Sequence, residues 1–347
     1  MPLTQLLGTA LPLVQAPMAG VQGSAMAVAV SEAGGLGSLP AALLGLDALR
    51  DELERIHAQT RKPYCVNFFC HTLPAPQDGQ PARWHAALAP YYAEMGLDMA
   101  QIASGPGRAP FSDAAADVLQ AFRPPVVSFH FGLPTPALLQ RVRSWGSKIL
   151  ASATTVEEAL WLQARGVDAI IAQGLEAGGH RGHFLSHDLS LQMGSFTLLP
   201  QIVRAVSVPV IAAGGIADAQ GVAAAMALGA AGVLVGTAYL LSDEATTSKV
   251  HRAVLQSPAA RHTVLTHLFT GRPARGIVNR VIRELGALND AAPAFPMATA
   301  AMAPLRAHAE RLDSGDFSPL WSGQNASGCL ALPAAEITRR LAQGFGA

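Results

Sequence analysis

The sequence has little charge and few cysteines. Only 14% of its 347 residues are charged, and 24 Lys and Arg balance 24 Asp and Glu, so the formal net charge is zero. Without excess positive charge, the chain has no electrostatic preference for nucleic acid or an anionic membrane. Its three cysteines, Cys65, Cys70 and Cys329, cannot all pair with one another. We therefore expect a cytoplasmic protein, monomeric or homodimeric, that acts on a small molecule.

Positive charge is also missing from the N-terminus, where the first Lys or Arg is Arg50. A secretory signal begins with a basic segment, so we expect none here. Residues 222–241 form an uncharged stretch, and its length is about that of a membrane span. The sequence LGAAG interrupts this stretch and favours a short buried helix followed by a buried strand. We therefore expect no membrane association.

Motifs of several common enzyme chemistries are absent. The sequence contains no GxxxxGK[ST], HExxH, GxSxG or Cys-x-x-Cys motif. Nucleotide hydrolysis, zinc proteolysis and serine hydrolysis therefore have no motif support. Cys65, Cys70 and His71 lack a second pair of ligands, so we expect no metal site.

Short apolar runs separated by segments of helical length are typical of parallel strands covered on both faces. The sequence holds eight such runs, and eight βα units predict an α/β fold, the (β/α)8 TIM barrel. The expected strands are 13–16, 35–38, 64–68, 126–130, 148–152, 169–173, 209–213 and 232–236. Helices are expected at 41–59, 155–165 and 218–228.

Two segments are too long to be simple crossovers. Residues 69–125 are expected to hold a helix pair with loops, and residues 241–310 contain two helical stretches with no clear strand between them. We therefore predict three parts. These are a barrel over 1–240, a small helical subdomain over the barrel mouth at 241–310, and a return to the barrel over 311–347.

Glycines follow the last two predicted strands. VPVIAAGGIAD and GAAGVLVGTAYL place Gly214, Gly215, Gly236 and Thr237 where barrels commonly bind phosphate. Glycine lets the main chain approach an anion, which backbone N–H groups can then bind. Tight turns are the alternative explanation. Because no Lys or Arg accompanies these glycines, the pattern suits a resident cofactor held by backbone dipoles.

Amide and imidazole groups follow other strands. Asn67 and Gln173 could bind the edge of a flat heterocycle, although a lone amide there is more often a cap or turn group. In EAGGHRGHF, His180 directly follows a glycine pair, and its imidazole could accept a proton or bind an anionic substrate. His130, at the end of the fourth strand, would face the same cavity or be a satisfied core histidine.

The other residues of the histidine loop have less defined roles. His183 is expected to support the site or to be solvated. Arg181 is expected to pair with Glu176 or to contact the cofactor.

These motifs together resemble the FMN-dependent nitronate monooxygenases, formerly called 2-nitropropane dioxygenases, and in particular the bacterial class I members. The matching motifs cover nearly the whole chain in the family's order: VQAPMAG, VNFFCH, SFHFG, AQGLEAGGHRG, PVIAAGGI, GVLVGTAYL, FTGRPARGIVN and PLWSGQ. The resemblance implies a barrel that binds FMN noncovalently. It also implies oxidation of alkyl nitronates, such as propionate 3-nitronate, by O2 to a carbonyl compound and nitrite.

The resemblance also implies roles for single residues. His180 would be the active-site histidine, and His130 and Phe295 would line the substrate cavity. Phe295 stands in APAFPMATAAMAPLR, where the family resemblance leads us to expect tyrosines, so the pocket is predicted to be more apolar. The implied FMN contacts are Met18, Ala19, Gly20, Asn67, Gln173, Gly178, Gly214, Gly215, Gly236, Thr237 and Gln324.

Two alternatives use the same glycines. The first is an NAD(P)H-dependent FMN reductase that acts on quinones or enoyl thioesters. The second is a barrel without flavin that binds or isomerises a phosphoribosyl ligand. EAGGHRG together with FTGRPARG favours the oxygenase over the reductase, and a flavin absorption band near 450 nm would distinguish it from the second alternative.

Overall fold

The computed structural model describes residues 1–75, 79–102 and 108–346. Eight parallel strands follow one another in the order β1-β9-β8-β6-β5-β4-β3-β2. A parallel bridge between Val14 and Leu36 brings the two ends of this sheet together and closes it. The strands are β1 (Leu13–Gln15), β2 (Gly37–Pro40), β3 (Tyr64–Phe69), β4 (Val126–His130), β5 (Lys148–Ala153), β6 (Ala169–Gln173), β8 (Val210–Ala213) and β9 (Gly232–Val235). The predicted (β/α)8 barrel is confirmed.

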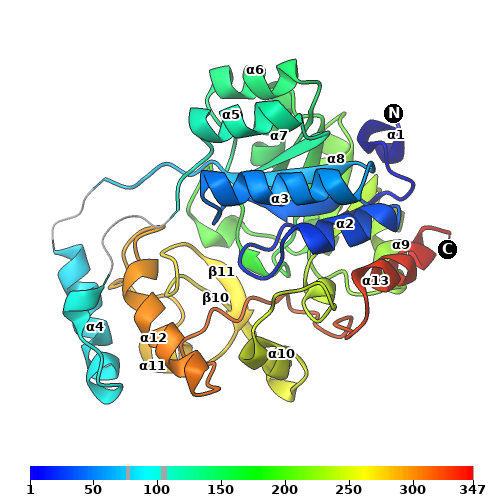
Figure 1. Ribbon diagram of the computed structural model, residues 1–347. Coiled ribbons are helices and arrows are strands. Elements are labelled where there is room, and N and C mark those ends of the chain that lie inside the picture. Colours follow the sequence, from blue (N-terminus) through cyan, green and yellow to red (C-terminus); the bar gives the residue numbers. More distant parts are fainter. Residues whose placement is uncertain (76–78, 103–107, 347) are drawn as a thin grey trace.

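Helices cover the outside of the barrel (Figure 1). They are α1 (Leu3–Leu7), α2 (Ser24–Glu32), α3 (Leu46–Gln59), α5 (Asp113–Phe122), α6 (Pro136–Ser144), α7 (Val156–Ala164), α8 (Ser195–Ala205), α9 (Ala219–Ala227) and α13 (Ala334–Ala342). Local capping explains two of the expected helices, because Thr155 and Asp218 accept hydrogen bonds from the N–H groups of Glu158 and Gly221. The helix expected from residue 41 begins later, after the cap residue Gly45.

A second group of elements lies on one side of the barrel. It contains α4 (Gln80–Glu94), α10 (Lys249–Leu255), α11 (Arg280–Leu285) and α12 (Thr299–Arg311), which gather on the lower side of Figure 1. The pair of helices expected within 69–125 is present as α4 and α5. Trp84 and Leu88 of α4 share an apolar cluster with Met302 and Leu305 of α12. The 69–125 insertion therefore packs against the segment that follows the last barrel strand.

The expectation that residues 241–310 contain no strand is wrong. An antiparallel sheet joins β10 (Thr263–Thr266), β11 (Ala274–Ile277) and β7 (Gly179–His180) in the order β10-β11-β7. Strands this short carry too few alternating positions for a period-two pattern to be detected. In β7, His180 is the register partner of Ala274. The predicted histidine loop is thus fixed to the hairpin that contains FTGRPARG.

In the described residues, no helix is long and apolar enough to cross a membrane. The uncharged stretch at 222–241 instead forms most of α9 and then β9, as expected.

Candidate active site

A cavity of about 200 Å³ opens at the carboxyl ends of the barrel strands. The predicted site residues that line it are Met18, Ala19, Asn67, His130, Gln173, Gly178, His180, Gly214, Gly215, Gly236 and Thr237. The fold therefore brings together groups from β1, β3, β4, β6, β8 and β9.

Three predicted residues are not among the described residues that line this cavity: Gly20, Phe295 and Gln324. Gly20 follows the lining residue Ala19 in a turn with φ +86°. The Gln324 side chain is exposed, while its backbone N–H donates to the Glu176 carbonyl at 3.0 Å. Phe295 packs on His180, with ring centroids 5.5 Å apart.

Several lining residues were missed by the sequence analysis. Trp321 and Gly323 come from the C-terminal return, within or beside the quoted motif PLWSGQ, which offered a signal for them. Phe69 and Ser152 lie in strands, whereas Arg108 comes from the insertion between β3 and β4. Nothing in the local sequence around Arg108 indicates that the chain returns to the cavity there.

The glycine turns after β8 and β9 fit a phosphate group. Among the described residues, no acceptor pairs with the N–H groups of Gly215, Gly236 or Thr237. Gly214 and Gly215 have φ of 110° and 75°, which side chains of L residues disfavour. Their backbone N–H donors remain available at the cavity wall, as an anion site requires.

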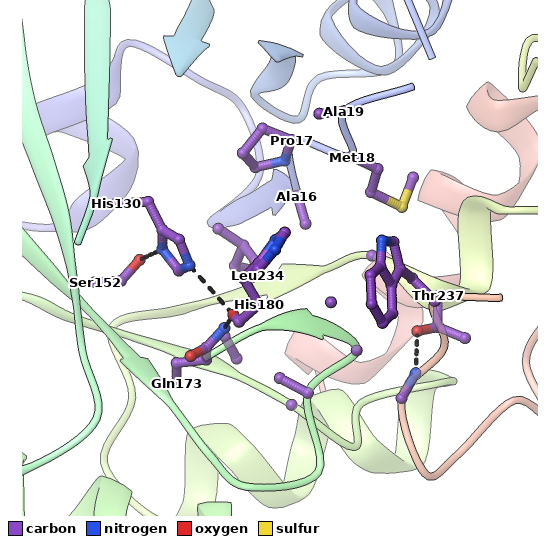
Figure 2. Close-up of a pocket in the computed structure, with 18 of the residues that line it drawn as sticks. Ala16, Pro17, Met18, Ala19, His130, Ser152, Gln173, His180, Leu234 and Thr237 are labelled. Atoms are coloured by element: carbon purple, nitrogen blue, oxygen red, sulfur yellow. Dashed lines mark hydrogen bonds between the residues drawn. The ribbon is translucent and has the colours of Figure 1, made fainter. Parts of the chain in front are cut away.

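The Thr237 hydroxyl has a separate role in this wall. It accepts a hydrogen bond from the Gly323 N–H at 2.9 Å (Figure 2). This contact ties the C-terminal return to the turn after β9.

The side-chain amides of Asn67 and Gln173 differ in which of their hydrogen-bonding atoms already have a protein partner. The Asn67 Nδ2 donates to the Ser128 hydroxyl at 2.9 Å, and no described donor reaches its Oδ1. In Gln173, Nε2 donates to the His180 carbonyl at 2.9 Å and Oε1 accepts from the Gly182 N–H at 2.7 Å. Asn67 can therefore still bind the edge of a ring, whereas Gln173 uses both ends of its amide to hold the histidine loop.

His180 stands among aromatic rings at the cavity wall. Its Nε2 lies 3.0 Å from the Thr270 hydroxyl, in the segment between β10 and β11. Burial lowers the pKa of His180 well below its usual value, and the nearby cation Arg108 lowers it further. The imidazole is therefore neutral at physiological pH.

His130 is engaged at both ring nitrogens. Nδ1 lies 3.0 Å from the Ser152 hydroxyl, and Nε2 lies 3.2 Å from the His180 carbonyl oxygen. Figure 2 shows His130 and Gln173 converging on the backbone of His180. Burial lowers the pKa of His130 to about 3, so this ring is neutral too. His130 reaches the cavity wall, but its hydrogen-bonding groups contact protein.

Two of the alternatives expected for the neighbours of His180 are wrong, the Arg181–Glu176 ion pair and a solvated His183. The Arg181 guanidinium is buried and donates to the carbonyls of Gly174 and Gln173, and no ion pair with Glu176 is found among the described residues. Glu176 instead accepts from the backbone N–H and the hydroxyl of Ser195. His183 is buried rather than solvated, and burial lowers its pKa to about 3. Arg181 therefore braces the loop through backbone carbonyls.

No group of three or more His, Cys, Asp or Glu side chains with metal-binding geometry occurs in the described part of the chain. The donors at the cavity wall include backbone N–H groups, amides, imidazoles and the Arg108 guanidinium.

Known proteins are similar to this chain over nearly its whole length. The family model described as nitronate monooxygenase matches residues 1–344. The chain belongs to the nitronate monooxygenase family. It is therefore an oxidoreductase of a flavin-dependent family.

Two relatives are named nitronate monooxygenase. The one from Pseudomonas aeruginosa is 38% identical over 98% of this chain and 97% of its own length. The one from Paraburkholderia phytofirmans is 40% identical over 98% of this chain and 93% of its own length.

Solved structures agree with the family assignment. A nitroalkane oxidase from Streptomyces ansochromogenes superposes with a TM-score of 0.90 at 40% identity, over 99% of this chain and 97% of that one. FabK from Thermotoga maritima superposes less closely, with a TM-score of 0.71 at 27% identity over 99% and 95% of the two chains.

Proposed function

We propose that the protein binds FMN and uses O2 to oxidise alkyl nitronates, such as propionate 3-nitronate, to a carbonyl compound and nitrite. The observation that carries this proposal is the pairing of a glycine-lined anion site with a neutral, immobilised imidazole at one cavity. Family membership and the relatives named for nitronates and nitroalkanes give independent support.

The cofactor would be held largely by the barrel. Gly215, Gly236 and Thr237 offer N–H donors for its phosphate, and Asn67 offers a side-chain acceptor for its ring system. Gly178 cannot bear a larger side chain, because a Cβ there would lie 2.5 Å from the Gly323 nitrogen. FMN, when bound, supplies the electron transfer between substrate and O2 that no side chain can provide.

The protein side chains would position the substrate. A nitronate is already a carbanion equivalent with its negative charge on the nitro oxygens, so no strong base is needed. His180, neutral and fixed through Thr270 and through its own carbonyl, is placed to orient this anion. A neutral imidazole can also accept a proton, so slow deprotonation of a neutral nitroalkane is compatible with the same residue.

An absorption spectrum and two assays test the proposal. Purified protein should absorb near 450 nm, release FMN on denaturation, and consume O2 with release of nitrite when given propionate 3-nitronate or ethyl nitronate. A colourless protein that does not take up FMN, or a flavoprotein inert toward both nitronates, would contradict it.

A reaction with NADH distinguishes the reductase alternative from the proposed oxygenase. Mixed with NADH in the absence of O2, the flavin should stay oxidised over the time of a nitronate turnover. Rapid bleaching would favour a reductase.

A further inference from the structure

Arg108, whose side chain is half-buried, differs from other buried or half-buried arginines in what its guanidinium contacts. Arg181 donates to the carbonyls of Gly174 and Gln173 and to the Gln192 amide oxygen. Arg252 and Arg275 likewise donate to backbone carbonyls. Among the described residues, Arg108 has one hydrogen bond, from Nη1 to the Thr299 hydroxyl at 3.2 Å. A guanidinium carries five N–H donors, so most of those of Arg108 remain unused.

The charge of Arg108 has no counter-ion among the residues that the structure describes. Among the described residues that line the cavity, Arg108 is the one Lys, Arg, Asp or Glu. No described carboxylate lies within ion-pair distance of it, and the charged group that acts on it is another cation, Arg306. Burial lowers the pKa of Arg108 to about 10, which leaves the side chain cationic at neutral pH.

The Arg108 guanidinium lies over an aromatic side chain, Phe295. Its guanidinium carbon lies 5.6 Å from the centroid of the Phe295 ring, and that ring in turn packs on His180. The backbone of Arg108 lies beside His71, which also packs on Phe295 with centroids 4.8 Å apart. The cation is thus held on the same side of the cavity as His180.

We propose that Arg108 is a specificity-determining residue that binds an anionic oxygen group of the substrate, either the nitronate itself or a carboxylate on the same molecule. Partial burial of a cation that has no partner among the described residues is costly, and an anion entering the cavity would reduce that cost. Planar groups with two oxygens match the fork of a guanidinium. This inference rests on the proposed function for the identity of the substrate.

Two variants and a matched control test the role of Arg108. Arg108→Met removes the positive charge. Arg108→Lys keeps the charge but lacks the planar guanidinium that can bind two oxygens at once. Arg306→Met removes a nearby cation that is already paired with Glu310 and does not line the cavity. All are assayed with ethyl nitronate, which has one charged group, and with propionate 3-nitronate, which also carries a carboxylate.

The KM values report the result. Loss of a charged hydrogen bond corresponds to an increase in KM of about 10- to 100-fold for Arg108→Met, with kcat changed by less than about threefold. An increase for both substrates assigns Arg108 to the nitronate, and an increase for propionate 3-nitronate alone assigns it to the carboxylate. Arg108→Lys should lie between wild type and Arg108→Met, and Arg306→Met should match wild type. KM values of Arg108→Met within about twofold of wild type for both substrates would overturn the proposal.

A binding measurement separates this inference from the proposed function. Sodium nitrate and sodium propionate, which are not turned over, are titrated calorimetrically into wild-type and Arg108→Met holoenzyme. Binding of either anion to wild type, weakened at least tenfold in the variant, supports the role of Arg108 even if no nitronate is oxidised. Equal binding to both proteins contradicts that role even if nitronates are oxidised. Equal flavin content and circular dichroism show that the variant is folded.

Discussion

The two sides of the cavity are built from different chemistry. The barrel side, formed by the turns after β8 and β9, offers backbone N–H groups and no charged side chain. The cap side offers a cation, Arg108, and an aromatic ring, Trp321, and behind them lie Phe295 and the Thr270 hydroxyl that contacts His180. Backbone donors on a rigid barrel suit a cofactor that stays bound, whereas side chains on loops suit a substrate that comes and goes. His180 lies where the two sides meet.

Replacing His180 should produce the largest effect, because it acts between the two sides. His180→Asn removes the imidazole while keeping a polar side chain, and it leaves the carbonyl that accepts from Gln173 and His130. We expect kcat/KM for nitronates to fall about 10²- to 10⁴-fold with flavin content unchanged. Oxygen consumption and the absorbance ratio at 450 and 280 nm measure the two quantities. Wild-type kinetics in this variant would remove His180 from the mechanism.

The barrel side is tested by a glycine substitution with a matched control. Gly215 and Gly146 have φ of 75° and 83°, so alanine strains the backbone similarly at either position, by roughly 1 kcal/mol. Only Gly215 lines the cavity. Gly215→Ala should weaken FMN binding at least about tenfold, measured by fluorescence of released flavin, while Gly146→Ala retains the cofactor. Equal flavin loss in both variants would mean that Gly215 matters only for the fold.

These two regions also differ in how well the sequence predicts them. The barrel side follows from short local patterns, since an apolar strand ending in glycines can be recognised without knowing any distant contact. Gly214, Gly215, Gly236 and Thr237 were expected at one wall and line it together. The cap side depends on segments far apart in the chain. Arg108 comes from the insertion after β3 and Phe295 from the segment before α12, and no local period places either of them near His180.

The hydrogen-bond partners of individual side chains are a second feature that could not be predicted from the sequence. A glutamine at the end of β6 is equally consistent with a ligand contact and with a loop brace, and only the distances to the His180 carbonyl and the Gly182 N–H identify the brace. Likewise, Arg181 near Glu176 in sequence suggested an ion pair, but its guanidinium is taken up by carbonyl oxygens. Competition among several acceptors is decided by tertiary geometry.

The link between the two sides is tested by Gln173→Leu. The leucine fills a similar volume but leaves the Gly182 N–H without its acceptor, which costs about 1–3 kcal/mol. We expect kcat to fall about tenfold because the histidine loop loses one of its side-chain anchors, and we also expect a lower melting temperature. The control is Gln201→Leu. Gln201 is a half-buried residue of α8, and its amide contacts Met193 and Thr197. A change in flavin binding alone would place Gln173 on the barrel side.

The smallest effect concerns pH and the neutral imidazoles. Because the pKa of His180 lies well below its usual value and that of His130 lies at about 3, neither ring gains a proton as the pH falls from 8.5 to 6.5. Turnover of preformed nitronate should therefore change less than about threefold across this range. A sigmoid with a midpoint near 6.5 that disappears in His180→Asn would show that His180 titrates in the working range.

The free energy of unfolding should decrease as the pH is lowered, although the turnover rate should change little. Unfolding raises the pKa values of His130, His183 and His251 from about 3, 3 and 4 to the ordinary value near 6.5, so the unfolded chain binds more protons below that pH. Each histidine then costs the folded state up to about 1.4 kcal/mol for every pH unit between 6.5 and its folded pKa. The melting temperature should fall as the pH is lowered from 7 to 5. His183 is not among the described residues that line the cavity, so replacing it with Asn should flatten this dependence, and an unchanged slope would mean that this ring is already charged in the fold.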